Sequence, residues 1–358
     1  MITERTTRLA ERIRAVEIDY LILSRPSHVL YLTGLKVCPG DRLFVAVLDA
    51  EGRLSFVCNR MLPMPESVYD SIVWYHDCDN GVFAVSSLIG VGSIVGIDSE
   101  WTYGYASSLA SIRTDLSFTN GSALIEQMRM IKDDAELELL RISSRINDKC
   151  MSYLVSEISG DLSEKELSEK LFDYHASLGQ GEAGGGAIIS YGVNAVDPHH
   201  FPDGSRLRPG DSVVMDFGFS YKGYLSDMTR TVFFREVPAE LEKIYRIVLQ
   251  AQEAAIALIR PGRSAGEIDE AARALIRAYG YEAYFPHRTG HGIGLDVHEP
   301  PFISSISDLI LLPGMVFSVE PGIYVPGLGG VRIEDLVIVT GNGAENLNSF
   351  TKELTTVS

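Results

Sequence analysis

The sequence predicts an α/β (α+β) chain built of two domains. Over the first 123 residues, short apolar strands alternate with short helices. From residue 124 onward, longer amphipathic helical segments alternate with β-hairpins. This change of pattern divides the chain into a smaller N-terminal domain (1–123) and a larger C-terminal domain (124–358). A chain of 358 residues can bury enough apolar surface to fold without disulfides or structural metals.

The N-terminal domain begins with an amphipathic helix that carries Leu9, Ile13 and Val16 on one face. A β-rich run follows over residues 19–34. A hairpin comes next, because the turn residues Asp49–Gly52 separate two apolar runs. A strand with the sequence SIVGID and a further helix complete this domain.

Four helices are expected in the C-terminal domain: one over residues 124–158, one after Ser163, one over 240–259 and one from Ser264 to Gly280. The second and the fourth begin with a capping box, in which a serine is followed three residues later by a glutamate. Gly280 is suited to ending a helix, because glycine readily takes the left-handed conformation. The stretches between these helices are predicted to form hairpins.

The charge balance and the cysteines exclude some partners. With 31 Lys and Arg against 48 Asp and Glu, the formal net charge is −17, which would repel nucleic acids and anionic membranes. The four cysteines lack the spacing of a zinc site and are expected to be buried free thiols of a reducing compartment. No signal-peptide core and no apolar run of about 18 residues is present. We therefore expect a cytoplasmic protein that binds neither nucleic acid nor membrane.

Two carboxylates lie within the apolar strands of a hairpin predicted at residues 212–234. With its turn at Tyr221–Gly223, this hairpin would place Asp216 directly opposite Asp227. Like charges in a cross-strand pair repel each other, and a buried charge without a partner is costly. A positive group is therefore expected between the two carboxylates.

A second hairpin, predicted at residues 315–340, repeats this arrangement. A turn centred on Gly327 would place Glu320 opposite Glu334, again within apolar strands. Each pair has a structural alternative, a salt bridge to Arg230 in the first hairpin and to Arg332 in the second. Two such pairs with histidines nearby favour a metal centre instead. Four carboxylates and a few imidazoles suit two divalent ions such as Mn²⁺, Co²⁺ or Zn²⁺.

Four of the eight histidines belong to this part of the sequence: His199, His200, His291 and His298. His291 is flanked by Gly290 and Gly292, which would let the backbone come close to a site. The other four, including His287 only four residues before His291, are interpreted as surface or partly buried histidines.

The ordered motifs MDFG…SDMTRT, GHGIGLDVHEPP, FSVEPGIYVPG and GVRIED resemble those of the creatinase/aminopeptidase P/prolidase family of metallopeptidases. The resemblance extends over essentially the whole chain and includes LILSRPSHVLYLTG in the first domain. It implies a small N-terminal mixed-sheet domain, followed by a pita-bread domain in which helices cover a curved antiparallel sheet. It also implies a homodimer.

The resemblance assigns the metal ligands to Asp216, Asp227, His291, Glu320 and Glu334. Asp227 and Glu334 would bridge two ions, Asp216 would complete one ion, and His291 and Glu320 would complete the other.

Further roles follow from the same resemblance. Glu320 would also act as the general base for the bridging water. His199 would assist at the scissile bond or its leaving nitrogen, with the adjacent His200 as the alternative. His298 would contact the substrate carbonyl and its oxyanion. Arg332 would contact the ligand residues without binding the metal itself. Asp335 would either do the same or lie on the surface.

The implied function is hydrolysis of the Xaa-Pro bond of dipeptides by a hydroxide that bridges two metal ions, the reaction of a prolidase. The alternative is an Xaa-Pro aminopeptidase that acts on longer peptides. A related small-amide hydrolase, a metal-free creatinase-like hydrolase and a non-catalytic pita-bread binding module are less consistent with a full set of ligands. The expected partner is a proline-containing peptide.

Overall fold

A computed structural model of the chain describes residues 4–183 and 185–358. The chain divides into two compact units between Arg129 and Met130. None of the helices in the described residues is both long and apolar enough to cross a membrane. The four cysteines are free, but only Cys58 and Cys150 are buried. The expectation of burial is therefore wrong for Cys38 and Cys78, which are exposed.

The N-terminal unit contains a six-stranded mixed sheet in the order β4-β3-β2-β1-β5-β6. Its strands are β1 (Tyr20–Leu23), β2 (Val45–Asp49), β3 (Leu54–Asn59), β4 (Ile72–Tyr75), β5 (Ile94–Ile97) and β6 (Ser117–Asn120). β2 is antiparallel to β1 and β3, and the other neighbours are parallel. The mixed sheet, the hairpin β2–β3 and the strand SIVGID are confirmed.

The helices of this unit are α1 (Glu4–Ala15), α2 (Pro26–Thr33), η1 (Glu66–Ser71), α3 (Gly81–Ser87) and α4 (Tyr103–Ile112). α3 and α4 share an apolar core with strands of the sheet, which includes Val85, Leu109 and Val47. α2 corrects the β-rich expectation for residues 19–34. Pro26 occupies its first turn, where a missing N–H costs little, and Gly34 (φ 74°) ends it.

The C-terminal unit contains four long helices: α6 (Asp134–Glu157), α7 (Glu164–Ser177), α8 (Ala239–Leu258) and α9 (Ala265–Ala278). The single helix predicted over 124–158 is wrong, because α5 (Ser122–Met130) ends and α6 starts anew. Asp133 and Glu136 form a capping box that satisfies backbone N–H groups at this new start. The capping boxes predicted for α7 and α9 are confirmed.

The described strands of this unit form two larger sheets and two small ones. One larger sheet consists of β8 (Ile188–Tyr191), β9 (Ser212–Phe217), β12 (Met228–Phe234) and β20 (Thr356–Val357). The other consists of β13 (Gly290–Gly292), β14 (Glu299–Ile303), β15 (Val316–Val319), β18 (Asp335–Val339) and β19 (Ala344–Asn346). The small sheets are β7 (Glu182–Ala183) with β10 (Phe219–Tyr221) and β11 (Tyr224–Leu225), and β16 (Gly322–Val325) with β17 (Gly329–Arg332). Only the pairing of β12 with β20 is parallel among these strands.

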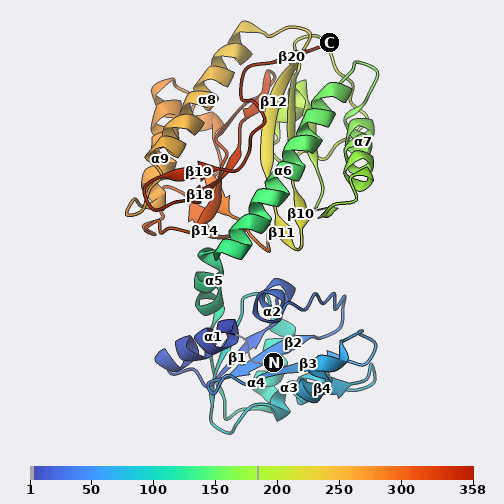
Figure 1. Cartoon of the computed structure of the whole chain (residues 1–358), viewed down its shortest axis with the longest axis vertical. Helices are drawn as coiled ribbons and strands as arrows, with labels where there is room; N and C mark the ends of the chain where they lie inside the picture. The colour runs from blue at the N-terminus through green and yellow to red at the C-terminus, as the bar shows by residue number, and fades with distance from the viewer. Residues whose placement is uncertain (1–3, 184) are drawn as a thin grey trace. The chain divides into compact units, whose positions relative to one another are not determined.

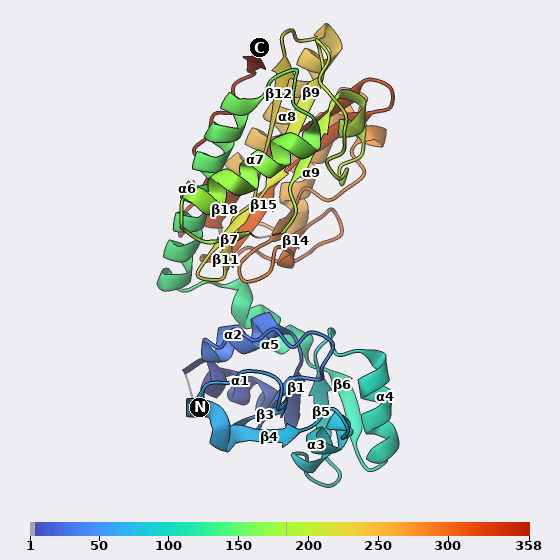
Figure 2. The same ribbon diagram turned by 90° about the vertical axis from the view of Figure 1, so that its right-hand side faces the viewer.

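The unit is built of two similar halves, each a helix pair on antiparallel strands (Figure 1). α6 and α7 share an apolar core with β8, β9 and β12, which includes Leu154 and Val213. α8 and α9 share another core with β15 and β18, which includes Val248 and Phe317. Figure 2 looks onto α7, with the strands of the unit behind it. The antiparallel sheets covered by helices are those that the motifs imply.

Candidate active site

A cavity of about 770 Å³ opens between the strands of the two halves. Its wall contains all the residues predicted for metal binding, catalysis or support: His199, Asp216, Asp227, His291, His298, Glu320, Arg332 and Glu334. Asp216 and His291 lie on strands of the two larger sheets, Arg332 lies on β17 of a small sheet, and the others lie in the connecting segments. The packing of the sheets therefore brings them together.

The first hairpin corrects the predicted pairing. Asp216 on β9 lies opposite Thr229 on β12, and not opposite Asp227. The cause is the turn, in which Lys222 (φ 51°) and Gly223 (φ 88°) form the two-residue, positive-φ connection that suits a tight hairpin. Asp227 lies in the break between β11 and β12, where it lines the cavity together with Asp216.

The register of the second hairpin is confirmed. Gly322 on β16 lies opposite Arg332 on β17, and the same register continues between β15 and β18. Glu320 and Glu334 lie in the short breaks between these two strand pairs. Their backbone N–H groups donate to the carbonyls of Thr289 and Thr229. Each glutamate is thereby tied to a further strand of the site.

Three of the predicted ligands offer atoms that all lie within 4.8 Å of one another: Asp227, His291 and Glu334. His291 Nε2 is 3.8 Å from Asp227 Oδ2 and 3.3 Å from Glu320 Oε1. The other ring nitrogen, Nδ1, lies 3.2 Å from the carbonyl of Gly292, to which it can donate. Burial lowers the pKa of His291 to about 4. The ring is therefore neutral and its Nε2 lone pair is available to a cation.

The carboxylates around this imidazole lack compensating charges. Burial raises the pKa of Asp227 and of Glu334 well above the usual values, and neighbouring carboxylates raise both further. Burial also raises the pKa of Glu320. Among the described residues, no Lys or Arg forms an ion pair with these three side chains, and Glu334 Oε1 is buried without a hydrogen-bond partner. Buried, unsatisfied oxygens among like charges fit divalent cations.

Asp216 differs, because its carboxylate forms an ion pair with Arg332. Arg332 also donates to the hydroxyls of Tyr324 (2.8 Å) and Thr229 (3.1 Å). The salt-bridge alternative paired Arg332 with the glutamates of its own hairpin, which the structure contradicts. Arg332 instead joins the second hairpin to the first, because the two strand systems are packed together.

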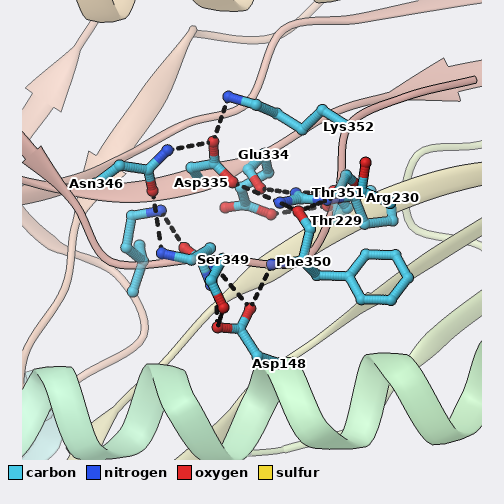
Figure 3. Close-up of polar contacts among 12 residues, drawn as sticks. Asp148, Thr229, Arg230, Glu334, Asp335, Asn346, Ser349, Phe350, Thr351 and Lys352 are labelled. Carbon is cyan, nitrogen blue, oxygen red and sulfur yellow. Dashed lines mark hydrogen bonds and ion pairs between the residues drawn. The ribbon is translucent and has the colours of Figure 1, made fainter.

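Arg230 supports Glu334 through the backbone (Figure 3). Its guanidinium forms an ion pair with Asp335 at 2.7 Å and donates to the carbonyls of Glu334 and Phe350. The salt bridge considered between Arg230 and the first carboxylate pair is therefore wrong. Asp335 is completely buried and also accepts hydrogen bonds from Gln252, Asn346 and Lys352. The surface position considered for Asp335 is therefore excluded.

The glycines beside His291 serve the packing of β13. A Cβ atom on Gly290 would lie 1.8 Å from the carbonyl oxygen of Ser318, and one on Gly292 would lie 2.4 Å from that of Glu299. The close approach that was predicted is therefore an approach to neighbouring strands.

Residues 138–341 match metallopeptidase family M24. The chain belongs to this family. Residues 5–131 match the creatinase/prolidase N-terminal domain. This M24 chain is 35% identical over 350 residues to an uncharacterized peptidase of Staphylococcus aureus. The aligned residues cover 97% of this chain and 99% of the relative.

Solved structures extend the similarity of this M24 chain to the whole fold. A dipeptidase from Pyrococcus horikoshii is 34% identical with a TM-score of 0.91, over 99% of this chain and 100% of that one. A prolidase from Thermococcus sibiricus is 33% identical with a TM-score of 0.93, over 99% and 98%. An X-Pro aminopeptidase from Thermotoga maritima is 27% identical with a TM-score of 0.86, over 98% and 99%. The pita-bread fold is confirmed, and the chain is a metallopeptidase.

The two adjacent histidines of this M24 peptidase have different surroundings. His199 lines the cavity, whereas His200 does not. His200 Nε2 lies 2.8 Å from a carboxylate oxygen of the buried Glu164. The geometry therefore favours His199 as the residue that meets a substrate.

The sequence interpretation missed His287, Arg288 and Tyr324. His287 and Arg288 line the cavity. His287 Nε2 lies 2.9 Å from the Tyr324 hydroxyl, which connects it to Arg332. The spacing of four residues between His287 and His291 was the available signal, whereas nothing local marks Tyr324.

His298 is the second predicted catalytic histidine, and its ring centroid lies 4.2 Å from that of His291. Burial and the neighbouring His291 lower its pKa to about 4, so the ring is neutral at pH 7. The residue that follows it, Glu299, forms a buried ion pair with Lys132 at 2.9 Å. This pair anchors the segment that carries His298.

Proposed function

We propose that this M24 peptidase is an Xaa-Pro dipeptidase that works with two divalent cations, Mn²⁺, Co²⁺ or Zn²⁺. The observation that carries the proposal is the set of buried carboxylates around His291, of which Asp227, Glu320 and Glu334 form no ion pair with a Lys or Arg of the described residues. Asp216, Asp227, His291, Glu320 and Glu334 would hold the ions. Bound there, the ions would supply a water that is deprotonated near neutral pH and a Lewis acid for the scissile carbonyl.

The protein's own side chains would then move protons and stabilise charge. Glu320 would take the proton of the attacking water as the general base. Ser318 Oγ donates to Glu320 Oε1 at 3.0 Å and would hold the carboxylate in place. His298 would donate to the carbonyl oxygen as it becomes negative, and His199 would assist protonation of the leaving proline nitrogen.

Arg288 supports the preference for dipeptides. Its guanidinium stacks on the ring of Phe302 at 4.4 Å from the centroid, at the wall of the cavity. No carboxylate among the described residues forms an ion pair with it. The free carboxylate of a C-terminal proline would supply the missing partner close to the scissile bond. A longer peptide has no charge at that position.

A cytoplasmic homodimer is proposed on the resemblance, with the four free cysteines as support for the compartment. The main alternative is an Xaa-Pro aminopeptidase, which the likeness to the Thermotoga maritima aminopeptidase keeps in consideration.

One experiment tests the dipeptidase proposal against the aminopeptidase alternative. Protein stripped with a chelator and reloaded with Mn²⁺, Co²⁺ or Zn²⁺ is assayed on Ala-Pro, Ala-Ala and Ala-Pro-Ala. We expect metal-dependent hydrolysis of Ala-Pro, with Ala-Ala as the negative control. Faster cleavage of Ala-Pro-Ala would favour the aminopeptidase. A folded protein that binds no metal and cleaves none of them would contradict the proposal.

A further inference from the structure

We propose that Glu164 and His200 form a buried clamp that positions His199 in the active-site cavity. The proposal concerns positioning residues, since neither side chain lines the cavity. It rests on the proposed role of His199, and it assigns to the second of the two adjacent histidines a role of its own.

The Glu164 carboxylate is completely buried at the start of α7 and accepts four hydrogen bonds. One oxygen accepts from the Tyr191 N–H (2.7 Å) and from Asn194 Nδ2 (2.9 Å). The other accepts from His200 Nε2 (2.8 Å) and from the Asp203 N–H (3.0 Å). All four donors belong to one loop, residues 191–203, which starts at the last residue of β8 and contains the short helix η2 (Gly192–Val196). A single buried carboxylate therefore ties both ends of this loop to α7.

The loop is also held from the other side. The carbonyl of Pro198 accepts a hydrogen bond from Arg332 at 3.3 Å, and Arg332 forms the ion pair with Asp216. His199 thus stands between two neighbours that are both restrained, Pro198 by Arg332 and His200 by Glu164. Because both neighbours are fixed, the backbone that carries the exposed, cavity-lining His199 is restrained, and less entropy is lost when the imidazole takes up a productive position.

A metal ion is the competing explanation for this cluster, because Glu164, His200 and Asp203 offer ligand atoms that lie close together. Both oxygens of Glu164 already have two donors each, and two of these donors are backbone N–H groups, which cannot bind a cation. A carboxylate can only accept from His200, so Nε2 carries a proton there. The arrangement is therefore that of a hydrogen-bonded anchor.

Three variants test the clamp. Glu164→Gln keeps the shape, but whichever way its amide turns, two of the four donors lose their acceptor. His200→Ala removes one donor at a half-buried position, and His200→Gln keeps a side-chain N–H that can reach Glu164. Glu169→Gln on the exposed side of α7 is the matched control.

With Mn²⁺-loaded enzyme and Ala-Pro, we expect kcat to fall about tenfold in Glu164→Gln and His200→Ala at little-changed KM. His200→Gln should recover most of the loss. In a His199→Ala background, Glu164→Gln should lower kcat less than about twofold further, because it acts through His199. Full additivity of the two changes would overturn the proposal.

A second readout does not depend on catalysis. Tyr191 N–H and Asp203 N–H donate to different oxygens of Glu164, so Glu164→Gln deprives one of these two amides of its acceptor. Hydrogen exchange at that amide should be at least about tenfold faster than in the wild type, and exchange at both amides should be unchanged in Glu169→Gln. Unchanged exchange in Glu164→Gln would overturn the clamp. So would the loss of a bound Mn²⁺ from His200→Ala, measured by elemental analysis. If the wild type did not cleave Ala-Pro, the proposed function would fail while the exchange data still decided on the clamp.

Discussion

At the scale of single residues, the cavity brings together three buried carboxylates that form no ion pair with a Lys or Arg of the described chain. Asp227, Glu320 and Glu334 are buried near one another, and the pKa of each is raised by burial. Asp216 alone has a cationic partner, Arg332. The metal-free protein therefore carries an electrostatic cost that bound cations would remove.

Asp227→Asn is expected to affect the stability of the metal-free protein and the enzymatic activity in different ways. The change removes one repelling charge, so we expect the metal-free variant to be as stable as the wild type or more stable by about 1 kcal/mol. It should lose stabilisation by Mn²⁺ and about a thousandfold or more in turnover. Urea unfolding with and without Mn²⁺, alongside an Ala-Pro assay, provides the measurement. Wild-type turnover in this variant would show that the site has been assigned wrongly.

Arg288→Leu tests the recognition of a free proline carboxylate. A lost charge-assisted hydrogen bond costs about 1.5–3 kcal/mol, which corresponds to a KM for Ala-Pro raised about 10- to 150-fold. Ala-Pro-amide lacks the carboxylate and should be cleaved equally by both proteins. Arg288→Lys keeps the charge and serves as the matched control. An equal loss of activity on Ala-Pro and Ala-Pro-amide would mean that Arg288 does not bind the proline carboxylate.

At the scale of elements, helix boundaries depend on a few capping residues that can be recognised from the local sequence. The capping serines of α7 and α9 are local signals, and both were predicted correctly. The break between α5 and α6 was missed although Asp133 and Glu136 form the same kind of box, because apolar periodicity runs through it. α2 was taken for β-structure because its apolar residues are consecutive, and Pro26 at its start was the neglected signal.

The contact of α7 with β10 predicts a pH dependence. The ring of His175 stacks on Phe219 with centroids 3.7 Å apart, and burial lowers its pKa. Below the ordinary histidine pKa of about 6.5, the unfolded chain binds a proton that the folded chain resists. Stability is therefore lost as the pH falls from 7 towards 5.

His175→Phe keeps an aromatic stack and removes the titration. We expect its urea midpoint to fall less between pH 7 and pH 5 than that of the wild type. His76→Phe, a change at an exposed histidine, is the control. Parallel pH profiles for the wild type and His175→Phe would refute this role.

At the scale of the whole molecule, all residues of the cavity belong to the unit that begins at Met130. Metal binding should therefore stabilise that unit selectively, by about 2.7 kcal/mol when the free cation is at a hundredfold its dissociation constant. Calorimetry of the full chain should show two unfolding transitions. Mn²⁺ should raise the midpoint temperature of only one of them, and a chelator should return that midpoint to its original value. Equal shifts of both transitions would contradict the independence of the two units.

Local sequence signals predicted the candidate residues of the site and those parts of the fold that depend on near neighbours in the chain. The register of the second hairpin and the capping boxes rest on residue type and short spacing. The five proposed ligand positions rest on the resemblance of the motifs to the family. The register of the first hairpin was also local, but it depended on the positive-φ turn at Lys222 and Gly223.

The contacts between distant side chains, in contrast, became visible only in the folded chain. Arg332 is 116 residues from its partner Asp216, and Arg230 is 105 residues from Asp335. Glu164 is 36 residues from His200, and its contact with His200 is what distinguishes this histidine from the adjacent His199. Such pairings depend on how helices and sheets pack, and short-range patterns do not encode that geometry. Residue type therefore defines the available chemistry, and packing selects the groups that can carry it out.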